Sequence, residues 1–156
     1  MKTVYRVLAY LIALEVVVHA ATSAFAVFGL GKWIDGGGVL DKATVESHSA
    51  NFTGVMGLVI HAINGQYVVP FLAVLLLMVS FFARVPMGVR WAALVFVLVI
   101  VQVFLGTFGH GIPQLGLLHG LNALLLFAVA DIAARRTRAA LAQPRTAAPV
   151  GTAGVV

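Results

Sequence analysis

Long apolar runs separated by short polar segments dominate the chain. Four runs are long enough to cross a bilayer, whose hydrocarbon core of about 30 Å needs about 20 helical residues rising 1.5 Å each. The expected spans are residues 4–30, 49–84, 89–110 and 114–134. The second run is too long for one straight crossing, and Pro70 predicts a kink within it, because proline removes a backbone hydrogen bond and clashes with the preceding turn. The pattern predicts an all-α, integral membrane four-helix bundle made of two helical hairpins.

Basic residues at the margins of the runs predict the orientation. Lys2 and Arg6 precede the first run, Arg84 and Arg90 flank the connection between the second and third, and arginines at 135, 136, 138 and 145 follow the fourth. By the positive-inside rule, both termini are expected in the cytoplasm and the bundle in the plasma membrane. The first run resembles a signal peptide, but it is longer than a signal core of about 7–15 residues, so we expect a retained span.

The end of the chain has a different composition. From residue 137 onward it is rich in Ala, Pro and Thr with little patterning, which predicts a disordered cytoplasmic tail over 137–156. The transmembrane bundle is therefore expected to occupy residues 1–136.

Composition supports the membrane class and excludes several others. Hydrophobic residues make up 62% of the chain and charged residues 10%, outside the usual range of soluble domains. The net charge of +5 follows from the topology, so no nucleic-acid partner is expected. There are no cysteines, which excludes disulfides and thiolate metal sites. The expected partners are the lipid bilayer and a second copy or a larger membrane complex.

A short polar motif occurs twice inside the apolar runs. His-x-x-Asn is found at His61 and Asn64 in the second run and at His119 and Asn122 in the fourth. The first and third runs each carry one polar residue at depth, Glu15 and Gln102. This pattern predicts a weak parallel internal repeat about an axis along the membrane normal. Asn122 is expected to form a hydrogen bond between helices.

The histidines are the main candidates for chemistry. Counting from the cytoplasmic arginines places His19 about 20 Å and His119 about 24 Å into the membrane. All five histidines, His48 and His110 included, fall in the outer half. Ionisable residues inside a span count as functional hypotheses. We therefore expect His61 and His119 to face each other and to bind one haem iron.

The residues around this pair fill out the hypothesis. Gly57, Gly116 and Gly120 are expected to let a flat macrocycle approach the backbone, and His19 and His110 are candidate further ligands or partners of the haem propionates. Zinc fits less well, because it takes three or four ligands that usually include a carboxylate or cysteine.

Other interpretations of the same residues stay open. The histidines can be explained as interhelical hydrogen-bonding groups, and the segment from Gly116 to Gly120 as a small-xxx-small packing motif. Glu15 and His19 share a helix face at i, i+4 spacing. They indicate a proton or quinone site, or a structural carboxyl bonded to Gln102 or a nearby backbone group.

Two stretches carry a family resemblance. "VMGLVIHAINGQYVVPFLAVLLL" at 55–77 and "VQVFLGTFGHGIPQLGLLHGLNALLLF" at 101–127 resemble one four-helix half of heme A synthase. The resemblance implies that His61 and His119 are haem ligands near the outer ends of the second and fourth helices. Where the family's catalytic half has a glutamate one turn before its first histidine, this chain has Gly57-Leu58, so hydroxylation of haem is not implied. The chain also resembles small actinobacterial four-helix membrane proteins, from which no function carries over.

Three functional classes follow from these observations. The first is binding of haem b between the second and fourth helices for electron transfer, haem handling or redox sensing. The second is a haem-free accessory or assembly subunit of a membrane complex. The third is an enzyme that modifies haem or quinone with Glu15 or His19. The resemblance disfavours catalysis like that of heme A synthase, because this chain lacks both the family's outer glutamate and the outer-loop cysteine pair that many members have.

Overall fold

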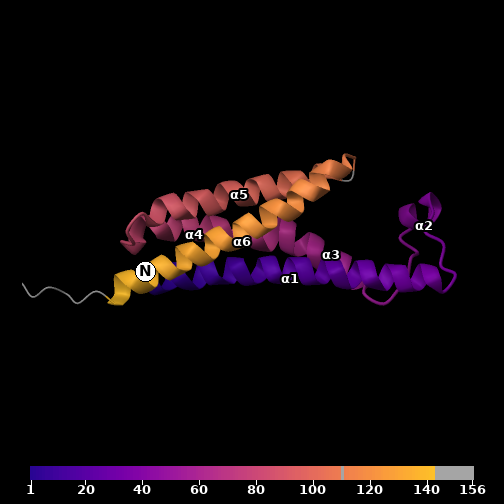
Figure 1. The fold of residues 1–156 in the computed structure, drawn as a ribbon, viewed down its shortest axis with the longest axis horizontal. Coiled ribbons are helices and arrows are strands. Elements are labelled where there is room, and N and C mark those ends of the chain that lie inside the picture. Colours follow the sequence, from indigo (N-terminus) through magenta and orange to yellow (C-terminus); the bar gives the residue numbers. More distant parts are fainter. Residues whose placement is uncertain (110, 143–156) are drawn as a thin grey trace, which may run out of the picture.

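A computed structural model describes residues 1–109 and 111–142, and every regular element in this part of the chain is a helix (Figure 1). The elements in order are α1 (Lys2–Asp35), α2 (Lys42–Glu46), α3 (Val55–Ile63), the π-helix η1 (Asn64–Val68), α4 (Val69–Ala83), α5 (Gly88–Gly109) and α6 (Pro113–Ala142).

Four stretches are long and apolar enough to cross a membrane, which confirms the predicted class. They are Lys2–Asp35, Val55–Ala83, Gly88–Gly109 and Pro113–Thr137. The second begins six residues after the expected start at 49, because Gly54 has a left-handed backbone (φ 96°) that ends the preceding turn. Helix α6 continues to Ala142, so residues 137–142 of the expected tail are helical, in keeping with their alanine and arginine content. Residues 143–156 of that tail lie outside the described part.

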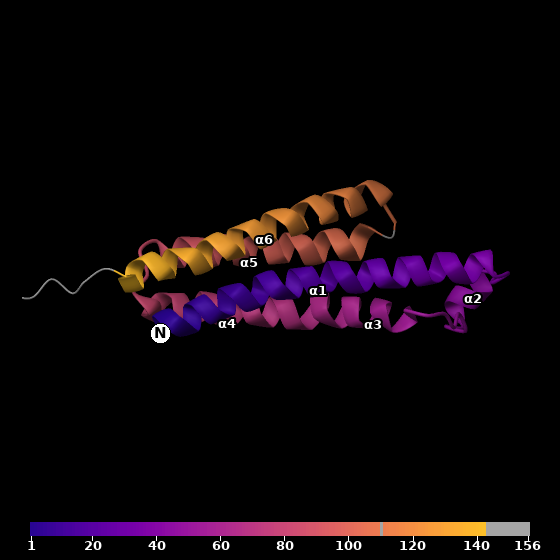
Figure 2. The ribbon, with the colours of Figure 1, turned by 60° about the horizontal axis from the view of Figure 1, so that its bottom comes forward.

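The four spans form two hairpins that lie side by side. Helix α1 pairs with α3, η1 and α4, and helix α5 pairs with α6. Between the hairpins, α1 packs against α6 and α4 against α5 (Figures 1 and 2). The N-terminus, the α4–α5 turn and the end of α6 lie at one end of the bundle, which we call the terminal end (Figure 1). Helix α2 and the α5–α6 turn lie at the opposite end, which we call the loop end.

The apolar core fills the terminal half of the bundle. Its fully buried large side chains include Tyr5 and Ile12 of α1, Leu76 of α4 and Leu126 of α6. The Tyr5 hydroxyl donates a hydrogen bond of 2.9 Å to the Gly88 carbonyl and so joins the two hairpins at the terminal end. Apolar burial and this hydrogen bond therefore hold the two hairpins together in the terminal half of the bundle.

Toward the loop end the hairpins separate (Figures 1 and 2). Among the described residues, no Cα atom of α3 lies within 8 Å of a Cα atom of α5 or α6. Helix α3 packs only against α1 and η1, through close approaches such as that of Gly57 to the Thr22 backbone. The loop half is thus stabilised within each hairpin rather than between them.

The helix around Pro70 contains a π-helical segment, η1, which ends two residues before the proline. A regular helix would bring the proline ring against the Gln66 carbonyl and leave that carbonyl without its i+4 donor. The wider turn of η1 lies just before the proline and relieves this clash, with the Val69 N–H donating to the Asn64 carbonyl. The extra residue in this turn changes which side chains after His61 face α1.

Helix α2 has a side-chain cap that makes it sensitive to acid. Asp41 Oδ1 accepts hydrogen bonds from the Thr44 N–H (2.8 Å) and the Thr44 hydroxyl (2.7 Å). The Thr44 N–H bond, followed by the hydroxyl bond, lowers the pKa of Asp41 below its usual value of 3.8. The cap therefore stabilises α2 above the ordinary aspartate range and is lost as the pH falls through the lowered pKa. We expect the Thr44 amide to lose protection from hydrogen exchange over that acid range.

The matched variant for this prediction is Asp41→Asn. Asparagine also caps helices but does not titrate, so its Thr44 amide should stay protected across the same pH range. An acid transition of equal midpoint in Asp41→Asn, measured by NMR on the same amide, would contradict the assignment to Asp41.

Candidate metal centre

The His-x-x-Asn motif of the first hairpin lies against two backbone carbonyls of α1. His61 Nδ1 is 3.0 Å from the carbonyl oxygen of His19, and Asn64 Nδ2 is 3.4 Å from the carbonyl oxygen of Glu15. These two carbonyls are four residues apart and therefore lie one above the other on one face of α1. The motif thus lies flat along one helical turn of its neighbour.

The second hairpin repeats this arrangement. His119 Nδ1 is 3.1 Å from the carbonyl oxygen of Gln102, and Asn122 Nδ2 is 3.0 Å from the carbonyl oxygen of Leu98. The accepting carbonyls are again four residues apart, so the motif has the same register on α5 as the first has on α1. The internal repeat predicted from the sequence therefore has a hydrogen-bonding basis, and the expected interhelical bond of Asn122 is confirmed.

The carboxyl of Glu15 has a different partner from the expected one. Asn64 Nδ2 donates to Glu15 Oε2 at 2.6 Å, whereas the expected partner Gln102 lies in the other hairpin. Gln102 Oε1 instead accepts from Asn122 Nδ2 at 2.6 Å, and its Nε2 donates to the carbonyl of His119 at 3.1 Å. Glu15 of α1 and Gln102 of α5 are therefore each hydrogen-bonded within their own hairpin.

These backbone bonds fix the tautomers of two histidines. A carbonyl oxygen can only accept, so Nδ1 of His61 and of His119 carries the hydrogen. In the neutral imidazole, Nε2 then holds a free lone pair. Metal-binding histidines commonly donate their second ring nitrogen to a carbonyl or carboxylate in this way, because it fixes the orientation of the ring. Both side chains are therefore prepared to act as ligands through Nε2.

A third histidine completes the cluster. The ring of His19 stacks on that of His61 with centroids 3.6 Å apart and 22° between the planes, and its centroid is 5.8 Å from that of His119. The centroids of His61 and His119 are 6.3 Å apart. One ring nitrogen from each of the three histidines lies within 4.8 Å of the others. Both ring nitrogens of His19 are buried without a hydrogen-bond partner, which is costly unless a ligand satisfies them.

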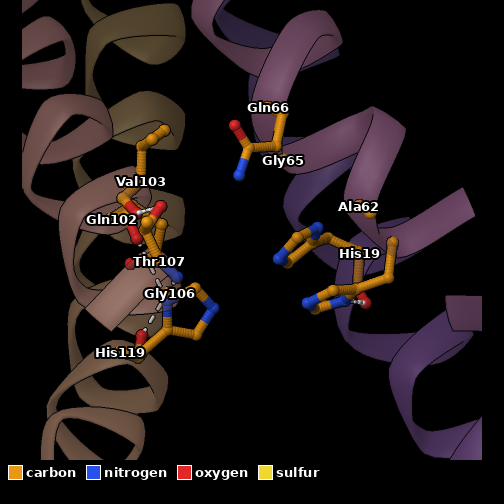
Figure 3. Close-up of a pocket in the computed structure, with 10 residues that line it drawn as sticks. His19, Ala62, Gly65, Gln66, Gln102, Val103, Gly106, Thr107 and His119 are labelled. Carbon is orange, nitrogen blue, oxygen red and sulfur yellow. Dashed lines mark hydrogen bonds between the residues drawn. The ribbon is translucent and has the colours of Figure 1, made fainter. Parts of the chain in front are cut away.

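The three rings border a cavity of about 140 Å³ between the hairpins. Figure 3 shows the imidazoles of His19 and His119 facing each other across it. Its wall also contains two glycines and a set of polar and small side chains, namely Ala62, Gly65, Gln66, Gln102, Val103, Gly106 and Thr107. No carboxylate belongs to this wall in the described part of the chain.

Two glycines make room for the imidazole rings. A Cβ atom on Gly65 would lie 2.6 Å from Cε1 of His19, and one on Gly106 would lie 3.0 Å from Cε1 of His119. Either distance requires the ring to move, since real Cβ atoms are rarely so close to a neighbour. Each hairpin thus supplies a glycine against which one ring packs.

The sequence placed only part of this site. His61, His119 and His19 meet as candidates, while His110 lies outside the described residues and His48 lies in the connection at the loop end. The glycines expected beside a macrocycle are elsewhere: Gly57 packs on α1, and Gly116 and Gly120 face open space. Gly65 was missed although it follows Asn64 directly.

No family model, curated protein or solved structure matches the chain. The site must therefore be interpreted from its own geometry.

Proposed function

We propose that this chain is a membrane protein that binds a transition-metal ion between its two hairpins through ring nitrogens of His19, His61 and His119. One observation carries the proposal, namely that three imidazoles from three helices bring their nitrogens within 4.8 Å of one another around a cavity. Imidazole is a suitable ligand for zinc, copper, iron and nickel. Three protein ligands with the fourth position left to water form a recognised zinc geometry.

The third histidine answers the objection to zinc that the sequence raised. His19, which the sequence named as a possible further ligand, raises the donor set to three and meets the required ligand number, although all three donors are imidazoles and none is a cysteine or carboxylate. Among the described residues of the wall, no carboxylate balances the charge on a divalent ion and no further general base adjoins the open position. This arrangement favours reversible binding and handling of the ion over hydrolysis.

Haem b is the second candidate, favoured by the resemblance and by the mirrored anchoring of His61 and His119. Their donor atoms suit a haem iron, which when bound supplies one-electron transfer. The space is less suitable, because the cavity of about 140 Å³ is below the range of about 300–1,000 Å³ typical of small-molecule sites. The rings of His19 and His61 are stacked with centroids 3.6 Å apart, so they must turn apart before either an ion or a haem iron can bind both imidazoles through their in-plane lone pairs. Haem binding requires the hairpins to separate further at the loop end.

Metal analysis and an absorption spectrum of the protein purified from its native membrane test both candidates. We expect about one zinc, copper, iron or nickel ion per chain and no Soret band, as for a single three-ligand site. The matched variant His61→Ala/His119→Ala should carry no metal. If the natural protein has a Soret band and the variant lacks it, the ligand of these histidines is haem and not a single ion. Absence of both metal and chromophore, also after incubation with Zn²⁺ or haem, overturns the proposal in favour of an accessory subunit.

Gly65→Ala is expected to weaken Zn²⁺ binding while the bundle remains folded. The added Cβ would displace the His19 ring from its place against η1, and ligand displacement lowers metal affinity by about 10- to 100-fold, as the loss of an orienting partner does. Titration with a zinc-binding dye as competitor measures the effect.

Gly120→Ala is the matched control, since its Cβ meets nothing within 4 Å although it directly follows His119. An equal loss of affinity in both variants would show that helix propensity rather than ring position is responsible.

A further inference from the structure

The surroundings of the three-histidine site differ strongly between its two sides. On the terminal side the site is bordered by apolar side chains of three helices, namely Val16 of α1, Val69 of α4, and Ala123 and Leu126 of α6. The polar groups at this level, Glu15 with Asn64 and Gln102 with Asn122, are hydrogen-bonded within their own hairpins. The apolar side chains form a layer that borders a cavity of only about 20 Å³, which has room for about one water molecule and offers it no polar lining beyond the site itself. Below this layer the packed core of Tyr5, Ile12 and Leu76 continues to the end of the bundle.

On the loop side no comparable apolar layer covers the site among the residues that the structure describes. Ala62 of α3 and Thr107 of α5 line the cavity from opposite hairpins and are both exposed. Helix α3 stays away from α5 and α6 throughout its described length. The cavity therefore opens between the separated ends of the hairpins, where the Thr107 hydroxyl can hydrogen-bond water.

We infer that the three-histidine site exchanges its ligand only with the aqueous phase at the loop end, and that the ligand is a hydrated cation arriving from that side. The identity of the ligand rests on the proposed function, whereas the one-sided access rests on packing alone. A cation cannot pass the apolar layer on the terminal side without losing its hydration, which costs several kcal/mol or more. With the termini in the cytoplasm, as the arginines predict, the ion comes from outside the cell.

Single cysteines test this access directly, because the natural chain has none. Ala62→Cys and Thr107→Cys place a thiol in the opening, and Ala123→Cys places one in the apolar layer. Lys42→Cys marks the loop end and Arg84→Cys the terminal end. Each variant is treated with a membrane-impermeant maleimide in vesicles of known orientation.

We expect Ala62→Cys and Thr107→Cys to react from the same side as Lys42→Cys. Their rates should exceed by at least about tenfold that of the lipid-facing control Leu121→Cys, because the reactive thiolate forms only in water. Ala123→Cys should be unreactive from both sides, and its folding is checked by its elution in detergent. Reaction from the Arg84→Cys side, or no reaction at Ala62→Cys and Thr107→Cys, overturns the inference.

Protection by Zn²⁺ separates this inference from the proposed function. Zn²⁺ should slow the labelling of Thr107→Cys, and His119→Ala in the same background should abolish the protection. Labelling from the loop side without protection supports the access route and rejects the metal site. Protection that persists in His119→Ala shows that the bound Zn²⁺ does not need His119 and rejects the three-histidine site.

Discussion

His19→Ala is expected to lower the affinity for Zn²⁺ by at least about 100-fold while leaving the bundle folded. Loss of an outer-shell partner alone typically costs 10- to 100-fold in metal affinity, so the loss of one of three ligands should cost no less. His19 contributes no hydrogen bond from its ring, because both of its ring nitrogens are without partners. The substitution therefore removes a donor and leaves the backbone bond from His61 to residue 19 in place.

This variant also distinguishes the two candidate ligands. In the haem arrangement His61 and His119 hold the iron, so His19→Ala should keep the Soret band. The matched control is His48→Ala, which removes a histidine from the connection at the loop end, outside the cluster. Zn²⁺ affinity is measured by dye competition. If His19→Ala has the same affinity for Zn²⁺ as the natural protein, His19 is not a ligand of the ion.

Gly29→Ala is expected to destabilise the bundle by about 1–3 kcal/mol, the usual range for overpacking. A Cβ on Gly29 would overlap the backbone carbonyl oxygen of Thr53, just before α3 begins. A backbone atom cannot turn aside as a flexible side chain can, so the start of α3 must move away from α1. Unfolding in detergent, followed by circular dichroism, measures the change in the free energy of unfolding.

Gly31→Ala controls for helix propensity in the same helix. A Cβ on Gly31 meets nothing within 4 Å, and alanine favours a helix over glycine by about 0.5–1 kcal/mol. The two substitutions should therefore have opposite signs. Equal effects would mean that α3 does not pack on α1 at Gly29.

The sequence predicted the four spans because their apolar runs match the thickness of a bilayer and turns separate them. The ends were less accurate. The second span begins later than expected, at Val55, because of the backbone of Gly54. The last helix ends later than expected, at Ala142, because its final residues include alanine and arginine. These are local backbone preferences that hydropathy does not contain.

The sequence paired two histidines where the chain repeats a motif and named His19 only as a candidate further ligand. His61 and His119 stand in equivalent positions, so the sequence could pair them. The position of His19 depends on how α1 crosses α6, which hydropathy leaves undetermined. Gly65 lies in the π-helical turn before Pro70. The extra residue in that turn rotates the following positions around the helix axis by about 100° relative to a regular α-helix, so a 3.6-residue pattern misplaces them.

The mirrored hydrogen bonds have a mechanical consequence. At the level of the site, the described side-chain hydrogen bonds do not cross between hairpins. Those of His61 and Asn64 lie within the first hairpin, and those of His119 and Asn122 lie within the second. The bond from Tyr5 to Gly88 joins the hairpins at the opposite end. Each hairpin can therefore tilt as a unit about the terminal end without breaking its own polar bonds. Any ligand that joins His61 to His119 sets the angle between the hairpins, so the width of the loop end reports whether that ligand is bound.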